Sequence, residues 1–268
     1  MKFLSKYVTA LSAALVLCGL STAAFAADDL TVTVGTKVWA NKWTSWDYYA
    51  PFQASPTVAV PGASESFTSS NHAAIIPALT VRYQDYLITG SLFAQKEYGF
   101  IGTTGQTFTA KRDETDLHAG YFLLPTLAVT LGYKEVKQDF GPNSTFKYSG
   151  PMVGLVGSAP LTKGYSLYGN FGYGAMTANF PNGFKDNAGN GSLPADYFLS
   201  EVGFAYSFDA KAIMPAAKAI TATVGYRNQT LATKDFAVGT DVTSPSKSRS
   251  TELRDNTEGL SFGLSLTF

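Results

Sequence analysis

The chain has 268 residues, and its 20 lysines and arginines balance its 20 aspartates and glutamates, so the formal net charge is zero. This balance argues against a nucleic-acid-binding protein, because such proteins carry a basic surface. Charged residues make up only 15% of the chain, against roughly 25% in typical soluble domains, and one cysteine with two histidines excludes an internal disulfide and a Cys/His zinc site.

The first 26 residues have the form of an export signal. Lys2 and Lys6 precede an apolar stretch over 8–20, and Ala24-Phe25-Ala26 has the small-x-small form of a signal peptidase site. An N-terminal membrane anchor is the alternative, but the apolar run is shorter than the ~20 residues that a spanning helix needs. We therefore expect cleavage after Ala26, which leaves 27–268 as a single domain.

Beyond this segment the dominant pattern has a period of two. In 30–38 the even-numbered residues are Leu, Val, Val, Thr and Val, whereas the odd-numbered ones are Thr, Thr, Gly and Lys. Apolar rows of the same kind occupy 75–83, 86–94, 117–123, 127–133, 165–173, 198–208, 220–226 and 260–268, and 148–159 is strand-like without a clear apolar face. Such alternation predicts about ten β-strands, each lying between two unlike environments. Eight or twelve strands are the alternatives, because 57–60 or 236–238 could add a hairpin.

Charges are confined to one side of these strands. The rows opposite the apolar ones carry Lys37, Arg82, Asp116, His118, Lys134, Glu201 and Arg227. A Lys or Arg side chain that faces lipid at mid-depth destabilises a barrel by about 2 to 4 kcal/mol. The backbone groups of a strand edge also need hydrogen-bond partners in hydrocarbon, and a closed ring provides them for every strand. We therefore expect an all-β, transmembrane antiparallel up-and-down barrel whose mildly cationic lumen contains these seven side chains.

The predicted connections alternate in length. Tight turns at 84–85, 125–126 and 160–164 alternate with polar links at 41–72, 97–114, 136–146, 178–196 and 229–256; the link at 209–218 is longer than the other inner turns. Outer-membrane barrels have short periplasmic turns and long extracellular loops, so both termini should lie on the periplasmic side.

Aromatic residues gather at both ends of the predicted strands. The inner group is Tyr83, Tyr86, Tyr165, Phe208 and Phe268, and the outer group is Tyr133, Tyr148, Tyr173, Phe198 and Tyr226. Amphipathic rings favour the headgroup zones of a bilayer, so the two groups predict two interfacial belts.

The final segment, 259–268, alternates hydrophobic residues and ends on an aromatic residue. It resembles the terminal strand of bacterial outer-membrane β-barrels, which the barrel-assembly machinery reads, and Leu264, Leu266 and Phe268 would form this assembly signal. The resemblance implies a Gram-negative outer membrane. The implied partners are outer-membrane lipid, lipopolysaccharide, the assembly machinery and periplasmic chaperones.

Two features are candidate sites. Asp116 and His118 lie on one face of a predicted strand, so the carboxylate could orient a base as in hydrolases; a structural pair in the lumen is the alternative. The chain departs from the omptin-type proteases, since it has no Asp-x-Asp pair.

The first polar link holds the second candidate, a group of aromatic residues: Trp43, Trp46, Tyr48, Tyr49 and Phe52. This density is typical of binding surfaces, but the same rings could anchor the loop at the headgroups or cover the barrel.

These observations favour a non-enzymatic, narrow porin-like pore for small solutes, because eight inward glycines would leave space in the lumen; a salt-bridged plug that conducts little is the alternative. A surface-binding or adhesion barrel acting through its loops is the second hypothesis, and a hydrolase using Asp116 and His118 is the third. Neither a cofactor nor a metal is expected.

Overall fold

The computed structural model describes residues 30–49, 52–55, 57–102, 105–181, 189, 191–241 and 244–268. The expected export signal, 1–26, lies outside these residues. None of the helices in the described ranges is long and apolar enough to cross a membrane.

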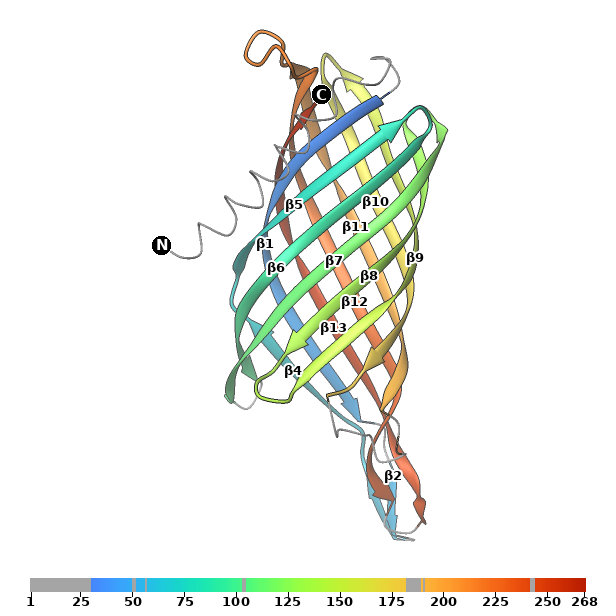
Figure 1. Cartoon of the computed structure of the whole chain (residues 1–268). Coiled ribbons are helices and arrows are strands. Elements are labelled where there is room, and N and C mark those ends of the chain that lie inside the picture. The colour runs from blue at the N-terminus through green and yellow to red at the C-terminus, as the bar shows by residue number, and fades with distance from the viewer. Residues whose placement is uncertain are drawn as a thin grey trace.

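Thirteen β-strands make up the described chain (Figure 1). They are β1 (Leu30–Tyr49), β2 (Phe52–Ser55), β3 (Val58–Val60), β4 (Ala63–Ser69), β5 (His72–Tyr83), β6 (Tyr86–Gly102), β7 (Thr107–Leu124), β8 (Leu127–Asp139), β9 (Thr145–Thr162), β10 (Tyr165–Asn179), β11 (Ser192–Asp209), β12 (Ala219–Asp241) and β13 (Ser244–Thr267).

Ten of these strands close into a ring of antiparallel neighbours. From β5 to β13 each strand pairs with the next one in the chain, and β1 pairs with β5 on one side and β13 on the other. The closing ladder between β1 and β13 extends from Thr33 opposite Thr267 to Tyr49 opposite Thr251. The expected antiparallel up-and-down barrel of about ten strands is thus confirmed.

An eleventh strand, β4, widens the sheet at one end. It pairs with β1 over 44–49 and with β6 over 100–102. This end, which also holds the β2–β3 hairpin at the bottom of Figure 1, is called the outer end below, and the end that holds Phe268 is called the inner end.

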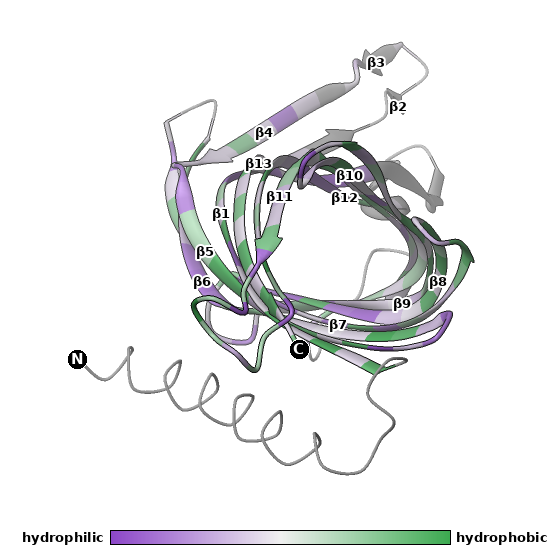
Figure 2. Ribbon diagram, turned by 90° about the horizontal axis from the view of Figure 1, so that it is seen from above, coloured by the Kyte–Doolittle hydropathy of each residue, from purple (hydrophilic) through white to green (hydrophobic). Residues whose placement is uncertain are grey.

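Apolar side chains cover the outside of the ring. Figure 2 views the ring from above, with apolar and polar residues along its strands. Every ring strand exposes at least one large apolar residue: Val38, Ile75, Ile88, Leu117, Leu131, Val153, Phe171, Phe204, Val224 and Phe262. Water would penalise such a surface, whereas acyl chains do not, so the ring carries the lipid-facing belt of a membrane barrel. The structure also settles the face of β9, since Val153 and Leu155 point outward.

The expected boundaries of the outer links are wrong. Most of the residues in 97–114, 136–146 and 229–256 belong to paired strands: β6 continues to Gly102, β7 begins at Thr107, β8 continues to Asp139, β9 begins at Thr145, and β12 and β13 pair as far as Asp241 and Ser244. Outside the hydrocarbon a paired strand no longer needs an apolar outward row, because water instead of lipid meets its outer face. The hydropathy pattern therefore marks the lipid-covered part of each strand and misses its polar continuation.

The inward glycines do not simply leave space. The ring of Tyr168 lies over Gly203 and Gly225, and a Cβ at Gly225 would collide with the Tyr168 hydroxyl. A Cβ at Gly132 would lie 2.5 Å from Cβ of His118. These glycines therefore allow large neighbours to pack inside a narrow barrel.

Candidate functional site

Arg112 on β7 crosses the outer half of the lumen. Its guanidinium donates to Thr257 Oγ1 on β13 at 2.8 Å and to Gln229 Oε1 on β12 at 3.1 Å. Because β12 is five strands away from β7 in the ring of ten, these bonds join opposite walls. Arg112 also donates from Nε to Glu114 Oε1 at 2.8 Å and is 1% exposed.

A second bridge crosses the lumen beside the first. Gln138 on β8 donates to Asp255 Oδ2 on β13 at 2.9 Å, again between opposite walls. Trp43 on β1 donates from its indole nitrogen to the other carboxylate oxygen of Asp255 at 3.1 Å. The two bridges together are called the outer layer below.

Lys134 on β8 extends the outer layer toward the inner end. Its ammonium lies 2.8 Å from Glu114 Oε2 and 2.8 Å from Asp116 Oδ2. Charged residues such as Asp113, Glu135 and Lys137 occupy the outward face near Glu114, so this part of β7 lies beyond the apolar belt. Burial raises the pKa of the Glu114 carboxyl, but the charges of Lys134 and Arg112 outweigh it and hold the pKa below its usual range.

Glu201 organises a second cluster of charges, called the Glu201 cluster below. Lys37 Nζ lies 2.7 Å from its Oε1 and Arg227 Nη1 lies 3.0 Å from its Oε2. The hydroxyls of Tyr168 and Ser261 donate to Oε1 at 3.0 and 3.1 Å. Fully buried carboxylates require this degree of compensation.

The buried charges balance. Lys37, Arg112, Lys134 and Arg227 meet the carboxylates of Glu114, Asp116, Glu201 and Asp255 in the described interior. The bonded part of the lumen is therefore neutral, and Arg82, which also faces inward, adds one positive charge outside it.

A cavity of about 370 Å³ lies in the barrel next to these charges. Its polar lining includes Thr80, Thr89, Ser91, Thr130, Asn170 and His118. Lys37, Arg227 and Asp116 also line it, so the Glu201 cluster and the inner edge of the outer layer meet this space.

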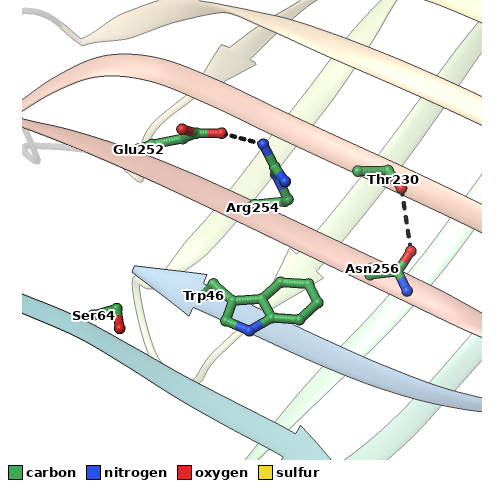
Figure 3. Close-up of a pocket in the computed structure, with 6 residues that line it drawn as sticks. All are labelled: Trp46, Ser64, Thr230, Glu252, Arg254 and Asn256. Carbon is green, nitrogen blue, oxygen red and sulfur yellow. Dashed lines mark hydrogen bonds and ion pairs between the residues drawn. The ribbon is translucent and has the colours of Figure 1, made fainter. Parts of the chain in front are cut away.

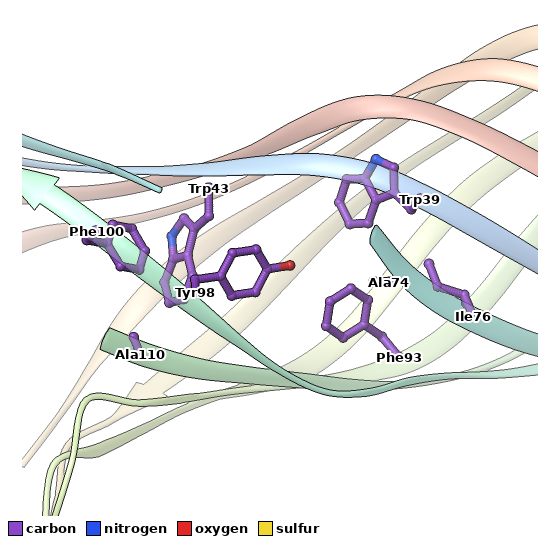
Figure 4. Close-up of a cluster of buried hydrophobic side chains, with 8 residues drawn as sticks. All are labelled: Trp39, Trp43, Ala74, Ile76, Phe93, Tyr98, Phe100 and Ala110. Carbon is purple, nitrogen blue, oxygen red and sulfur yellow. The ribbon is translucent and has the colours of Figure 1, made fainter. Parts of the chain in front are cut away.

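One side of the lumen is apolar (Figure 4). This luminal apolar cluster consists of Trp39, Trp43, Ala74, Ile76, Phe93, Tyr98, Phe100 and Ala110. Trp39 and Phe93 meet edge to face with ring centroids 6.2 Å apart, and Trp43 packs on Phe100 at 4.9 Å. Lumens of membrane barrels are normally polar, so a packed aromatic side of this size is unusual.

The structure places all seven predicted lumen residues on inward-facing rows. Six of them, all except Arg82, line the cavity or join the bonded clusters. Arg82 lies near the inner end, where its guanidinium carbon stacks 3.9 Å from the Phe122 ring centroid and Nε donates to Gln84 O.

Asp116 and His118 do not form the geometry of an oriented base. The Asp116 carboxylate accepts from Lys134 at 2.8 Å, and the described contacts include no hydrogen bond between Asp116 and His118. The arrangement fits a structural role for Asp116.

The aromatic candidates of the first link are divided between two faces of β1. Trp43 is fully buried in the lumen, so its assignment to a surface loop is wrong. Trp46 is 36% exposed on the outside. Tyr48 and Tyr49 belong to the paired part of β1 and Phe52 to β2, and the side chains of these three lie outside the described part.

Trp46 lines a hollow of about 420 Å³ on the outer surface (Figure 3). The other lining residues are Ser64, Thr230, Glu252, Arg254 and Asn256. Arg254 donates to Glu252 Oε1 at 2.6 Å, and Thr230 donates to Asn256 Oδ1 at 3.1 Å. This polar hollow with one exposed indole is called the exterior pocket below.

Tyr148 also differs from its expected place, since it is buried inside the barrel rather than part of the outer belt. Of the assembly-signal residues, Leu264 is exposed on the belt. The backbone amide of Phe268 donates to Val32 O at 2.9 Å, which ties the chain end to β1.

Sequence reasoning missed Arg112, Glu114, Gln229 and Asp255. A usable signal existed for three of them, because Arg112 and Glu114 continue the inward row of Asp116 and His118, and Gln229 continues that of Arg227, at a spacing of two.

No protein-family model and no curated protein matches the chain. Among solved structures, the outer membrane protease OmpT of Escherichia coli is 15% identical with a TM-score of 0.47, covering 92% of this chain and 99% of that one. The outer membrane protein AlkL is 11% identical with a TM-score of 0.41, covering 92% and 94%. The toluene transporter TodX of Pseudomonas putida is 10% identical with a TM-score of 0.30, covering 91% and 90%. These structures belong to the class that the sequence predicts, the bacterial outer-membrane β-barrels.

Proposed function

We propose that this chain is a non-enzymatic outer-membrane conduit for small solutes, closed in its resting state by the outer layer. The observation that carries the proposal is the pair of cross-lumen bridges beside an internal cavity of about 370 Å³. A barrel that served only as a rigid anchor would gain nothing from an internal cavity of this size.

The outer layer is suited to act as a gate because its bridges consist of side chains alone. Breaking the contacts of Arg112 with Thr257 and Gln229 would open the layer without separating any strands. The charge balance of the interior predicts weak selection between small anions and cations.

Planar-bilayer recordings test this function on the wild type and Arg112→Ala. We expect rare, brief openings in the wild type and a stable discrete conductance in Arg112→Ala, with Gln138→Ala as a second variant that removes the other bridge. Arg254→Ala is the matched control, because Arg254 bonds only Glu252 on the exterior among the described contacts. Absence of discrete conductance from all folded variants would refute the proposal.

The remaining assignments follow from the same placement in the outer membrane. Cleavage after Ala26, contacts with lipid and lipopolysaccharide, and recognition of Leu264, Leu266 and Phe268 by assembly factors are proposals supported by the apolar belt and the terminal sequence. Phe268→Ala should slow assembly, which pulse-labelling with a heat-modifiability gel would measure.

A second candidate function is surface binding, which the exterior pocket favours. Its exposed Trp46 beside Arg254 and Asn256 has the chemistry of a sugar-binding site, where an indole stacks and polar groups bind hydroxyls. Titration with purified lipopolysaccharide should change the tryptophan fluorescence of the wild type and not that of Trp46→Phe. An equal response from both proteins would contradict this function.

A further inference from the structure

The wall of the barrel is not hydrogen-bonded along its whole height. The β5–β6 ladder ends where Ala78 pairs with Ser91. Pairing to β6 resumes only at its outer end, through β4 at 67–69 and the bond from Ser70 N to Gly99 O. In the described chain, 72–77 of β5 and 92–98 of β6 face one another without any ladder pairing, and this stretch is called the seam below.

Apolar side chains close the seam in place of backbone bonds. Behind it lies the luminal apolar cluster, in which Ala74, Ile76 and Phe93 are 3%, 6% and 3% exposed. On the lipid side, Ile75 and Leu92 flank the seam and are 49% and 52% exposed. Next to the cavity the seam is therefore apolar on both sides, and Figure 4 shows its luminal side; Gln95, Lys96 and Glu97 lie in its outer part.

Two local features of the sequence prevent the ladder from continuing. Pro77, the first seam residue after the last pair, has no N–H to donate. On β6 a bulge between Phe93 and Lys96 shifts the register against β7 and reverses which residues point inward. Both features lie on the two strands that separate, and bulges in barrels are typical of functional positions.

Spaces lie at both ends of the seam. Ile76, Ala78 and Ser91, at its inner end, line the 370 Å³ cavity. Ser70, Gly99 and Phe100, at its outer end, line a separate hollow of about 800 Å³. A solute in the cavity therefore contacts the residues where the wall stops being bonded.

From this geometry we propose that small, uncharged apolar solutes pass sideways between the cavity and the lipid through the seam. The buried Phe93 side chain would block this path while the seam is closed. The proposal rests on the proposed conduit function and names its substrate class and its exit. Opening any other part of the wall would break ladder hydrogen bonds in hydrocarbon, whereas opening the seam displaces only side-chain packing. Charged solutes would be excluded next to the cavity, because Ile75, Ile76, Leu92 and Phe93 offer them no polar partner there.

Influx of the apolar fluorophore N-phenylnaphthylamine into cells that express the protein tests this route. Phe93→Ala should raise the influx rate several-fold, and Phe204→Ala is the matched control, since Phe204 is exposed on β11, which is paired on both sides.

A second variant closes the seam. The double variant Ala73→Cys/Gln95→Cys places one exposed thiol on β5 and one on β6, on the two sides of the seam. Joining the two thiols with a bis-methanethiosulfonate linker should abolish the protein-dependent influx, and removing the linker with a reductant should restore it. The only native cysteine, Cys18, lies in the expected export signal. This variant keeps the test decisive if Phe93→Ala does not fold.

The two proposals fail in different ways. If linking the seam leaves apolar influx unchanged while Arg112→Ala still conducts ions, the seam route is wrong and the gated conduit stands. If the linker blocks influx while Arg112→Ala never conducts, the outer layer is not an ion gate and the seam is the route of transport. If neither effect is seen, both proposals are wrong.

Discussion

Replacing Glu201 by glutamine tests whether the charges in the lumen form a cooperative cluster. The carboxylate is 0% exposed and accepts from Lys37, Arg227, Tyr168 and Ser261. Glutamine keeps the size and one carbonyl acceptor, but it leaves two cations without a counter-charge and points amide hydrogens at one of them.

The size of the effect follows from the burial of these partners. Removing one member of a buried ion pair costs about 3–5 kcal/mol. The Lys37 side chain is 33% exposed to the cavity, so water solvates part of its charge, whereas that of Arg227 is 9% exposed. We therefore expect the low end, about 3 kcal/mol, a more than hundredfold change in the folding equilibrium.

Urea unfolding in lipid vesicles, followed by heat-modifiable gel migration, measures this free energy. Glu135→Gln is the matched control, because Glu135 pairs with Lys137 and Lys147 at the surface and should contribute less than about 1 kcal/mol. A second change, Lys37→Met, should restore part of the stability of Glu201→Gln. If Glu201→Gln and Glu135→Gln lose the same stability, the cluster is not held together by its charges.

Three further predictions concern single positions. The lowered pKa of Glu114 means that its stabilising charge is fully present above the ordinary pKa of 4.5 and is lost as the pH falls toward the lower folded pKa. The free energy of unfolding of the wild type should therefore fall with pH below about 4.5, and that of Glu114→Gln should fall less over the same range. Gly225→Ala should cost about 1–3 kcal/mol through overpacking against Tyr168, while Gly99→Ala, with open space at its Cβ, should be neutral in the same unfolding assay. His118→Ala should retain folding and conductance, and loss of a hydrolytic activity in this variant would instead support the enzyme hypothesis.

Much of the ring could be predicted because lipid imposes a strict alternation on each strand. The outward row of β11, from Phe198 to Phe208, illustrates this, since each large residue at a spacing of two faces out. The same rule could have placed Trp43 in the lumen, because Trp39 and Trp43 continue the row of Lys37. The aromatic character of Trp43 instead suggested a surface loop, and the polar Asn41 and Lys42 before it obscured the continuing strand.

The seam and the added strand could not be read from the pattern. One extra residue in β6 changes the parity after Phe93, so that Tyr98 and Phe100 point inward although they belong to the opposite row. Insertion of β4 between β1 and β6 depends on long-range pairing that leaves no local signal. The cross-lumen partners of Arg112 likewise depend on which strands lie opposite one another once the ring has closed.

The height of the barrel has a consequence for any solute that arrives from the outer end. β12 has 23 residues and β13 has 24. At a rise of about 3.4 Å per residue and a tilt of about 40°, they extend roughly 60 Å along the axis, more than twice the ~25 Å of an apolar band. β8 has only 13 residues, about 34 Å by the same measure, so the outer part of β12 and β13 extends beyond the closed ring. A solute that arrived from the outer end would therefore meet this protruding pair of strands, which stands clear of the bilayer, before it reached the closed ring.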